Sequence, residues 1–537
     1  MTRVPTFDQR DAVAFELDAL EARRARGGVS RRKAQGAHYT PPELVDHLVT
    51  EALLGLRIGP GGPLVLDPAC GSGNFLVEVA RRLAAHGSAP ISRILSESIH
   101  GYDIDPVAVG LARDQLMALL PARTGRTVRG RVAAALKGHV IVRDALDGAG
   151  YAAPGGDAFD LIVGNPPFLN QLEKGTAASR ADARRIAERT AGAVRRYADL
   201  ASAFLVIALG ELAPRGRLAF VMPQSFLSTA DARPARDESL QRARVRSIWS
   251  SADSHFSAAK VRVCGLVFGK SASRTALRRA FGSGFARLSG PCSPPAVGDE
   301  SWAPLLAEGF GAPRVAGSRS TRSIGAFARA TADFRDQYYG LRGAIEEDGT
   351  GPRLATTRHI DLASCTWGAC EVRALGVRYA RPTIDPSQLH GRKGMDGWLE
   401  ARLVPKVLVS TQTKVLEAFV DARGEYAPLV PLITVTPLGR TSLWMIAAAI
   451  ASPVVVARAL TLYAGSALGA GAIKLSARQL LAMPAPIDGA LWRRSARALE
   501  ARDFKAFAEY SCAAHRIAAR DSRELVRFWL SRLGAQG

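Results

Sequence analysis

The sequence predicts an α/β protein in which a mostly parallel sheet is followed by a second domain of mixed α/β structure. Between residues 60 and 270, short apolar runs alternate with amphipathic segments, the pattern of repeated strand–helix–strand units. Residues 282–300 are rich in Gly, Pro and Ser, which is typical of a linker. The chain has 537 residues, more than a single hydrophobic core usually contains.

The expected strands and helices follow from the apolar pattern. The strands of the parallel sheet are expected at 64–66, 99–102, 139–142, 161–163, 217–221 and 263–268. Helices are expected at 75–85, at 106–120 and, near the end of the chain, at about 488–535.

Two longer apolar runs could be either buried helices or membrane-spanning helices. Residues 201–213 are too few to cross a bilayer. Residues 442–460 are interrupted by Pro453 and carry Arg458. Both runs are therefore expected as buried helices, and no membrane association is expected.

Composition narrows the class of protein. Lys and Arg number 71 against 49 Asp and Glu, a formal net charge of +22. Such a surface attracts polyanions, of which nucleic acid is the commonest; an arginine-rich composition without such a partner is the alternative. The six cysteines include no Cys-x-x-Cys pair, so neither a disulfide framework nor a zinc site is expected. Residues 1–28 lack the apolar core of a signal sequence, which favours a cytoplasmic protein.

The first candidate site follows the first expected strand. The strand ends at Asp67, the small residues 69–73 form a tight turn, and a helix begins near Asn74. A phosphate-binding loop would contain Gly-Lys-Ser/Thr, and a dinucleotide loop would have a third glycine where Leu76 stands. The loop is therefore expected to bind a nucleoside that carries no phosphate.

Acids at the ends of the next two strands extend this pocket. Asp103 is placed to accept hydrogen bonds from both hydroxyls of a ribose. The alternative for Asp103 is a helix cap, but Asp105 before Pro106 fits the cap better. Asp144 ends the third strand and suits an adenine amino group, although a capping role is equally supported there.

The fourth strand ends in Asn165-Pro166-Pro167-Phe168. The Asn165 side-chain oxygen and the Pro166 carbonyl are two acceptors, and the prolines remove competing N–H donors and stiffen the turn. Two fixed acceptors suit an amino group, because binding both hydrogens favours a pyramidal nitrogen whose lone pair can attack an electrophile. Phe168 would stack on the ring that carries the amine. A Pro-rich strand terminator without a function is the alternative.

Together these motifs resemble the N6-adenine DNA methyltransferases, which use S-adenosylmethionine (SAM). Residues 36–49 resemble the N-terminal cofactor segment of that family, and residues 254–270 resemble the segment whose aromatic residue, here Phe256, packs on the extruded adenine. The order of the motifs, with the target-recognition region last, is similar to the gamma class of restriction-modification enzymes. The resemblance implies a Rossmann-like class I SAM-dependent methyltransferase fold with a seven-stranded sheet. It also implies base flipping and direct methyl transfer without a metal.

The resemblance implies a domain plan and a set of site residues. The plan is an N-terminal helical extension (1–35), a catalytic domain (36–280), a linker (281–305) and a target-recognition domain with C-terminal helices (306–537). The implied cofactor-binding residues are Tyr39, Thr40, Pro41, Asp67, Pro68, Ala69, Cys70, Gly71, Gly73, Asp103, Ile104, Asp144, Ala145 and Asn165. The hypothesised DNA contacts are Arg195, Arg196, Arg335, Lys406 and Lys414. For each of these basic residues, an ordinary solvated charge is the alternative.

The expected function is site-specific methylation of adenine N6 in double-stranded DNA, within a restriction-modification or phage-defence system. Any nuclease is expected on a separate chain. Two alternatives stay open: methylation of RNA or of protein glutamine by the same Asn-Pro-Pro-aromatic chemistry, and a catalytically silent DNA-binding subunit. Neither the target sequence nor the oligomeric state follows from the sequence.

Overall fold

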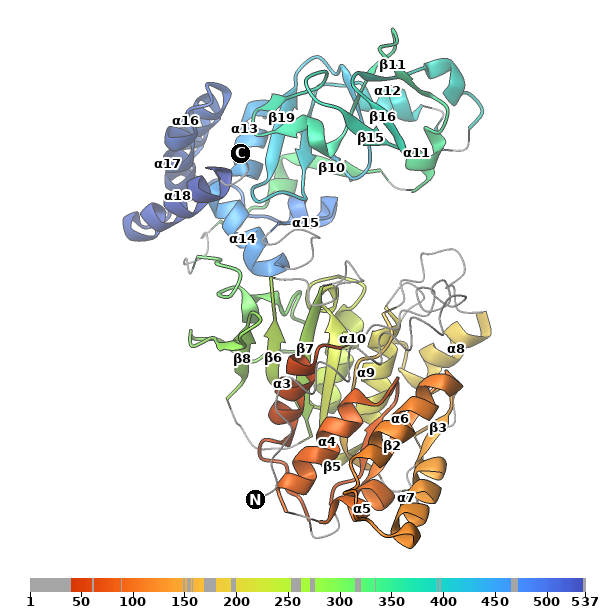
Figure 1. The fold of residues 1–537 in the computed structure, drawn as a ribbon. Coiled ribbons are helices and arrows are strands. Elements are labelled where there is room, and N and C mark those ends of the chain that lie inside the picture. The colour runs from red at the N-terminus through yellow and green to blue at the C-terminus, as the bar shows by residue number, and fades with distance from the viewer. Residues whose placement is uncertain are drawn as a thin grey trace. The chain divides into compact units, whose positions relative to one another are not determined.

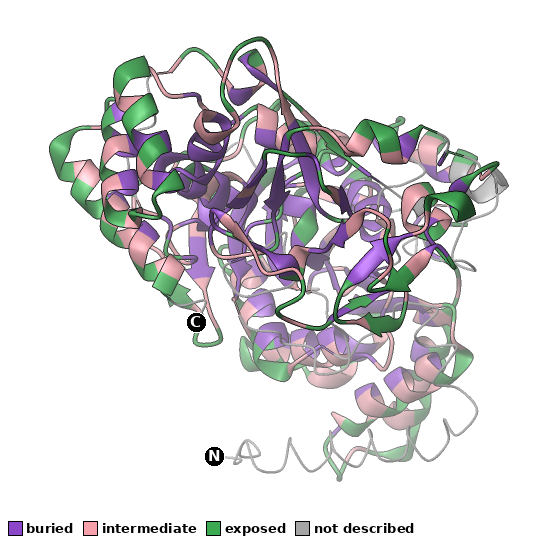
Figure 2. Ribbon diagram, turned by 90° about the horizontal axis from the view of Figure 1, so that it is seen from above, coloured by how far each residue is buried: buried purple, intermediate pink, exposed green. Residues whose placement is uncertain are grey.

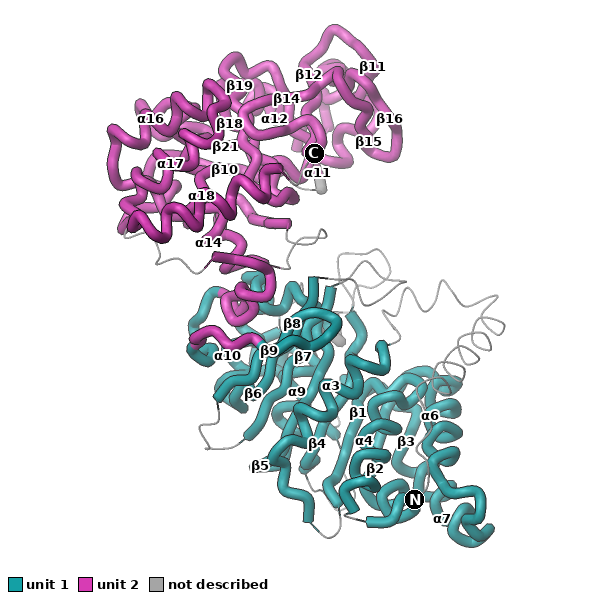
Figure 3. The backbone as a smooth tube through the Cα atoms, turned by 60° about the vertical axis from the view of Figure 1, so that its left-hand side comes forward, with its two compact units in different colours: residues 1–287, 293–300 teal, residues 288–292, 301–537 magenta. Residues whose placement is uncertain are grey.

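The structure is a computed structural model with two compact units. It describes residues 40–534, except for 60–61, 88, 148–149, 152–155, 157, 169–179, 195–198, 253–261, 271–275, 314–319, 334, 393, 396 and 465–471. Unit 1 comprises the residues up to 287 together with 293–300, and unit 2 comprises 288–292 and the residues from 301 onward (Figure 3). The expected N-terminal helical extension lies outside the described residues.

A nine-stranded sheet forms the centre of unit 1, in the order β3-β2-β1-β4-β5-β7-β6-β8-β9 (Figure 1). Its strands are β1 Val65–Asp67, β2 Ile99–Asp103, β3 Val140–Val142, β4 Phe159–Gly164, β5 Leu212–Pro223, β6 Arg244–Ser250, β7 Val263–Gly269, β8 Arg278–Phe281 and β9 Ala286–Arg287. Strands β1 to β5 are parallel, and β7 runs antiparallel to both β5 and β6. The predicted fold class, α/β with a mostly parallel sheet, is confirmed. The sheet has two short strands beyond the predicted seven.

Helices cover the sheet of unit 1. They are α3 Pro42–Leu53, α4 Asn74–Ala85, α5 Ile91–Arg93, the π-helix η1 Ile94–Ser98, α6 Pro106–Ala118, α7 Arg126–His139, α8 Arg180–Arg189, α9 Leu200–Gly210 and α10 Arg233–Arg242. The chain leaves the centre of the sheet in opposite directions after β1 and after β4, so right-handed connections place α4 and α9 on opposite faces. The strands between them are buried, as their purple colour in Figure 2 shows. Residues 201–209 of α9 are all buried, which confirms that this apolar run is a core helix.

Unit 2 contains two four-stranded sheets and two separate pairs of strands. The sheet orders are β10-β21-β18-β19 and β11-β17-β12-β20, and the pairs are β13-β14 and β15-β16. The strands are β10 Ala328–Ala332, β11 Ile345–Glu347, β12 Arg353–Ala355, β13 Ile360–Asp361, β14 Ser364–Cys365, β15 Val372–Ala374, β16 Val377–Tyr379, β17 Pro382–Ile384, β18 Lys406–Ser410, β19 Glu417–Asp421, β20 Tyr426–Pro428 and β21 Ile433–Pro437. This region is the expected mixed α/β part of the chain.

The helices of unit 2 gather mainly in its C-terminal part. They are α11 Arg335–Gly340, α12 Trp398–Arg402, α13 Leu443–Ala451, α14 Pro453–Tyr463, α15 Ala477–Leu481, α16 Gly489–Glu500, α17 Phe504–Ala514 and α18 Ala519–Gly534. Five short 3-10 helices complete the described elements: η3 Gln224–Leu227, η4 Ala303–Leu306, η5 Ile324–Ala326, η6 Thr357–His359 and η7 Pro386–Leu389. Within the described chain, no single helix is long and apolar enough to cross a membrane; α13 and α14, bent by 50° at their junction, pass that test of length and composition only as a pair.

Candidate active site

The centre of the sheet is a topological switch point. Strand β1 lies between β2 and β4, and all three run parallel, with Leu66 beside His100 on one side and Ile162 on the other. In open parallel sheets, ligands bind at the carboxyl ends of the strands next to such a point. In the order of the sheet, the strands β3, β2, β1 and β4 end at a predicted polar residue or within two residues before it; these residues are Asp144, Asp103, Asp67 and Asn165. Since neighbouring strands lie about 5 Å apart, these residues share one edge.

Asp67 at the end of β1 holds the adjacent turn in place. Its side chain is 1% exposed, and its Oδ1 accepts a hydrogen bond from the Ala69 N–H at 3.0 Å. A Cβ atom at Gly164 would lie 2.5 Å from the same oxygen, so β4 can end beside Asp67 because residue 164 is glycine. Burial, with a smaller contribution from nearby Asp103, raises the pKa of Asp67 to about 8. This places Asp67 beneath the loop as an anchor.

The loop after β1 presents backbone toward the strand ends. The Gly71 N–H donates to Asp103 Oδ2 at 2.8 Å, and the Cys70 N–H donates to the Tyr102 carbonyl at 2.8 Å. Gly71 has a φ of +52°, and a Cβ there would meet no heavy atom of the described chain within 4 Å. Helix α4 begins directly afterwards, at Asn74. The loop therefore leaves a strip of exposed backbone where a ligand can approach closely.

Asp103 at the end of β2 is partly committed to this loop. Its Oδ1 accepts from the Asp105 N–H at 2.9 Å and its Oδ2 from Gly71, while a carboxylate offers about four acceptor positions. Burial raises the pKa of Asp103 above its usual value. Asp105 accepts from the Val107 N–H at 2.9 Å and caps α6, as expected. The next residue, Ile104, is 55% exposed, so an apolar side chain stands beside the acid.

Asp144 after β3 forms a local turn. Its Oδ1 accepts from the Leu146 N–H at 2.8 Å, and the residue is exposed. Ala145 is buried, and its carbonyl accepts from Arg189 of α8 at 3.2 Å. The helix-capping alternative for Asp144 is not what the structure shows, because residues 145–147 form a turn and not a helix. A contact with a ligand through the second oxygen stays a prediction.

Asn165 after β4 has its amide oriented by a residue far away in the sequence. The Asn165 Nδ2 donates to Thr40 Oγ1 at 2.9 Å, across 125 positions. Thr40 is 5% exposed and stands just before α3, which packs on the sheet so closely that a Cβ at Gly265 would lie 2.6 Å from a Leu48 methyl. Because Nδ2 is bound to Thr40, the amide oxygen points to the other side of the amide group. Sequence reasoning assigned Thr40 to the cofactor and missed this bond, for which the sequence offers no signal.

The structure leaves the predicted role of Phe168 open but contradicts the predicted DNA contact of Lys406. Phe168 is 9% exposed, so its ring is largely covered, and its stacking role stays a prediction. Lys406 is fully buried on β18, where it forms an ion pair with Asp421 on β19. The hypothesis that Lys406 contacts DNA is wrong, because its charge is enclosed in the core and neutralised there.

Several predicted residues are not tested by the structure. Lys414 is half-buried, and its carbonyl accepts from Arg532 Nε at 2.6 Å. Arg335 begins α11, but its side chain lies outside the described atoms. Tyr39, Arg195, Arg196 and Phe256 also fall outside the described residues.

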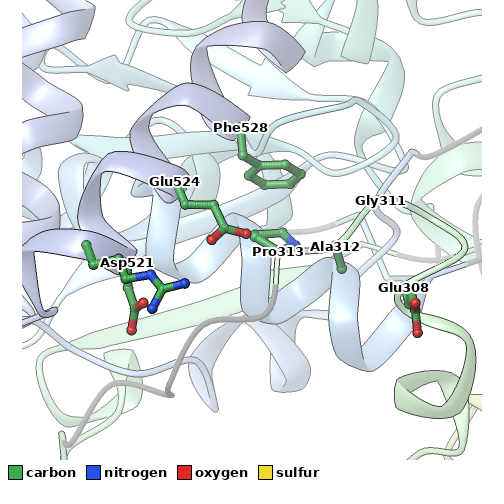
Figure 4. A pocket seen from close by; sticks show the side chains of 8 residues that line it. Glu308, Gly311, Ala312, Pro313, Asp521, Glu524 and Phe528 are labelled. Carbon is green, nitrogen blue, oxygen red and sulfur yellow. The ribbon is translucent and has the colours of Figure 1, made fainter. Parts of the chain in front are cut away.

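A cavity of about 610 Å³ lies within unit 2. Its lining includes Glu308 and, on α18, Asp521, Glu524 and Phe528 (Figure 4). Arg520 also lines the cavity, but three carboxylates outnumber this one guanidinium group, so the cavity repels phosphate groups. This cavity is therefore not a suitable site for the nucleic acid that the net charge predicts.

The fold and the sheet edge are those of the class I SAM-dependent methyltransferases, and a sequence comparison finds a family match in the same part of the chain. Residues 28–280 match the model of the family described as N-6 DNA Methylase. The family and the fold imply SAM as the methyl donor.

Curated relatives match over limited regions. The type II methyltransferase M.VspI of a Vibrio species is 26% identical over 215 residues, which are 39% of this chain and 42% of that protein. The adenine-specific methyltransferase PglX of Streptomyces coelicolor is 30% identical over 178 residues, covering 25% of this chain and 14% of PglX. The chain thus spans less than half the length of these relatives.

A solved structure extends the likeness of fold over both units. The Type IIL restriction-modification enzyme MmeI, solved in complex with DNA, matches 95% of this chain and 77% of its own with a TM-score of 0.57. The sequence identity is 13%, so this similarity concerns the fold.

Proposed function

We propose that this protein methylates the N6 amino group of adenine in double-stranded DNA, with SAM as methyl donor, as part of a restriction-modification or defence system. The observation that carries the proposal is the amide of Asn165, held by Thr40 at the carboxyl end of β4, one strand away from the glycine loop after β1. The family of residues 28–280, the adenine specificity named for PglX and the net charge of +22 support adenine and DNA as the substrate.

The residues at the sheet edge fit the nucleoside part of SAM. The open backbone at Gly71 allows close approach, Asp103 has acceptor positions left for ribose hydroxyls, and the exposed Ile104 offers an apolar surface for a purine ring. Asp144 would accept from the amino group of that purine. When bound, SAM supplies a methyl group made electrophilic by a positively charged sulfur.

Asn165 and Pro166 act on the substrate amine. The Asn165 Oδ1 and the Pro166 carbonyl accept its two hydrogens, and Thr40 keeps Oδ1 rather than Nδ2 on the substrate side. Both hydrogen bonds strengthen as the amine nitrogen gains positive charge, so they stabilise the transition state more than the ground state. The target adenine must leave the duplex to reach this site, since its N6 is otherwise stacked and paired. Phe168 would hold the flipped ring by stacking.

Methyl transfer from radiolabelled SAM to duplex DNA, RNA and protein tests this proposal. We expect transfer to duplex DNA and its loss by about 100-fold or more in Asn165→Ala, by analogy with other lost transition-state hydrogen bonds. SAM affinity, measured by calorimetry, should be retained in Asn165→Ala and weakened in Asp103→Ala, which serves as the comparison variant.

Each other outcome rejects part of the proposal. Normal turnover by Asn165→Ala would remove this residue from the mechanism. Transfer to RNA or protein but not to duplex DNA would identify one of the alternative substrates. A wild-type chain that binds no SAM would instead be a catalytically silent subunit.

A further inference from the structure

Strands β15 and β16 form an isolated two-stranded ribbon in unit 2, at the margin of that unit in the view of Figure 3. The ribbon comprises residues 372–379, and we call it the basic ribbon. Its turn consists of Leu375 and Gly376, both with positive φ (50° and 94°), the geometry of a tight two-residue hairpin. The ribbon therefore consists of two three-residue strands joined by a tight turn.

One face of the basic ribbon is fixed to the core of unit 2. Val372 and Ala374 are buried, and Leu375 and Tyr379 pack against the cluster that contains Leu341. Leu375 adopts a left-handed conformation that is unfavourable for a leucine, and its packing holds it there. The ribbon is therefore a fixed support for whatever its other face presents.

The opposite face presents two arginines side by side. Arg373 and Arg378 are directly opposite each other in the register, both are exposed, and the side chain of Arg378 is 82% exposed. Like charges opposite each other destabilise an antiparallel pair. The ion pair of Arg378 with Glu371 spans 4.0 Å between two exposed side chains and offsets little of this repulsion. A partner that accepts hydrogen bonds from both guanidinium groups would remove the cost.

A second arginine cluster in unit 2 has closer ion pairs than the basic ribbon. Arg353 and Arg381 lie over the ring of Trp367 at 5.0 and 5.3 Å, but each has its own carboxylate, Glu425 at 3.3 Å and Asp348 at 3.2 Å. These arginines are already engaged within the fold.

On the basic ribbon, Arg373 Nε donates to the Gly376 carbonyl at 3.1 Å. Arg378 pairs with Glu371 at 4.0 Å. Neither contact is a close ion pair, so the other guanidinium nitrogens of these two arginines are the better candidates for an external partner.

We propose that the basic ribbon enters the major groove of DNA and that Arg373 and Arg378 contact base edges there, so that they help to determine the methylated sequence. This inference rests on the proposed function. The major groove admits a two-stranded ribbon, and a guanidinium group can donate two hydrogen bonds to guanine O6 and N7. Val377 is opposite Ala374 in the register and so belongs to the other face of the ribbon, which leaves the base contacts to the two arginines.

The test compares sequence discrimination rather than affinity alone. Long-read sequencing of DNA from a host that expresses the wild-type chain first identifies the methylated motif. Dissociation constants are then measured for a duplex with that motif and a duplex in which it is scrambled. The ribbon variant is Arg373→Ala/Arg378→Ala, and the control is Arg493→Ala/Arg497→Ala, which removes two exposed charges from α16.

We expect the ratio of the two dissociation constants to fall by about tenfold or more in the ribbon variant and to stay unchanged in the control. SAM affinity should be unaffected in both. Arg373→Lys/Arg378→Lys keeps the charge but loses the planar fork, so it should lose discrimination while it retains affinity for scrambled DNA. This second variant also decides the question if the alanine variant fails to fold.

An unchanged ratio in the ribbon variants would overturn the inference, because the arginines would then contact phosphates or nothing, while the proposed function would stand. A wild-type chain that binds SAM but methylates no DNA would overturn the proposed function, and the inference with it.

Discussion

The hydrogen bond from Asn165 Nδ2 to Thr40 Oγ1 makes a sharp prediction for Thr40→Val. Valine has nearly the same shape as threonine but a methyl group in place of the hydroxyl. The substitution removes the acceptor at 2.9 Å and leaves the packing of a 5% exposed side chain largely intact. The Asn165 amide would lose the contact that distinguishes its nitrogen from its oxygen.

The magnitude follows from the burial of this bond. A buried donor left without its partner costs about 1–3 kcal/mol. The amide can escape part of that cost by rotating, which turns Nδ2 toward the substrate amine and removes an acceptor from it. We therefore expect turnover to fall by roughly 5- to 150-fold, the equivalent of about 1–3 kcal/mol.

Steady-state kinetics with a duplex DNA substrate separates this role from cofactor binding. We expect Thr40→Val to lower kcat with little change in the KM for SAM, and Thr40→Ser, which keeps the hydroxyl, to restore most of the turnover. In an Asn165→Ala background, Thr40→Val should have little further effect, since both residues act through one bond. A large rise in the KM for SAM with unchanged kcat would refute this reasoning and return Thr40 to the cofactor site that the resemblance implies.

Two further predictions concern buried charge. The raised folded-state pKa of Asp67, about 8 against an ordinary 3.8, means that its contribution to stability is present at acid pH and is lost as the pH rises through this window. The thermal midpoint of Asp67→Asn relative to wild type should therefore increase from pH 5 to pH 8, and a constant difference would show that this carboxyl does not titrate there. Lys406→Met leaves Asp421 buried without its cation and should cost about 3–5 kcal/mol of stability. Because Lys406 is buried, Lys406→Met should leave the salt dependence of DNA affinity unchanged. A Lys406→Met protein that is as stable as wild type but binds DNA more weakly would contradict the buried position of Lys406.

Most of the sheet could be predicted from the chain because its strands are short apolar runs. Each of the six expected strands is present, with ends shifted by a few residues; β5 begins earlier than expected, at Leu212, where it pairs with Phe159. Strand β6 (Arg244–Ser250) was missed because its arginines and serines conceal a buried strand. Arg246 is 5% exposed there, and such burial depends on neighbours that the local sequence does not reveal.

The candidate site was predictable for a similar reason. Polar residues that directly follow parallel strands are brought to one edge by the sheet itself, whatever the details of packing. The basic ribbon was not predicted, because a Leu-Gly step between two three-residue strands is not one of the usual hairpin signals. Its two-residue turn contains leucine at a position where Asn, Asp or Gly is usual, and the core contact of Leu375 explains why leucine is tolerated.

By itself, the sequence determined the class of fold and the order in which the site's polar residues leave successive strands, because these features depend on local apolar patterning and on short loops. The tertiary structure alone decided that Thr40 orients Asn165, that Gly164 makes room for Asp67, and that Lys406 is enclosed with Asp421. These contacts join positions that are 15 to 125 residues apart in the chain. They depend on which strands become neighbours and how closely helices pack on them, and local sequence carries no record of either.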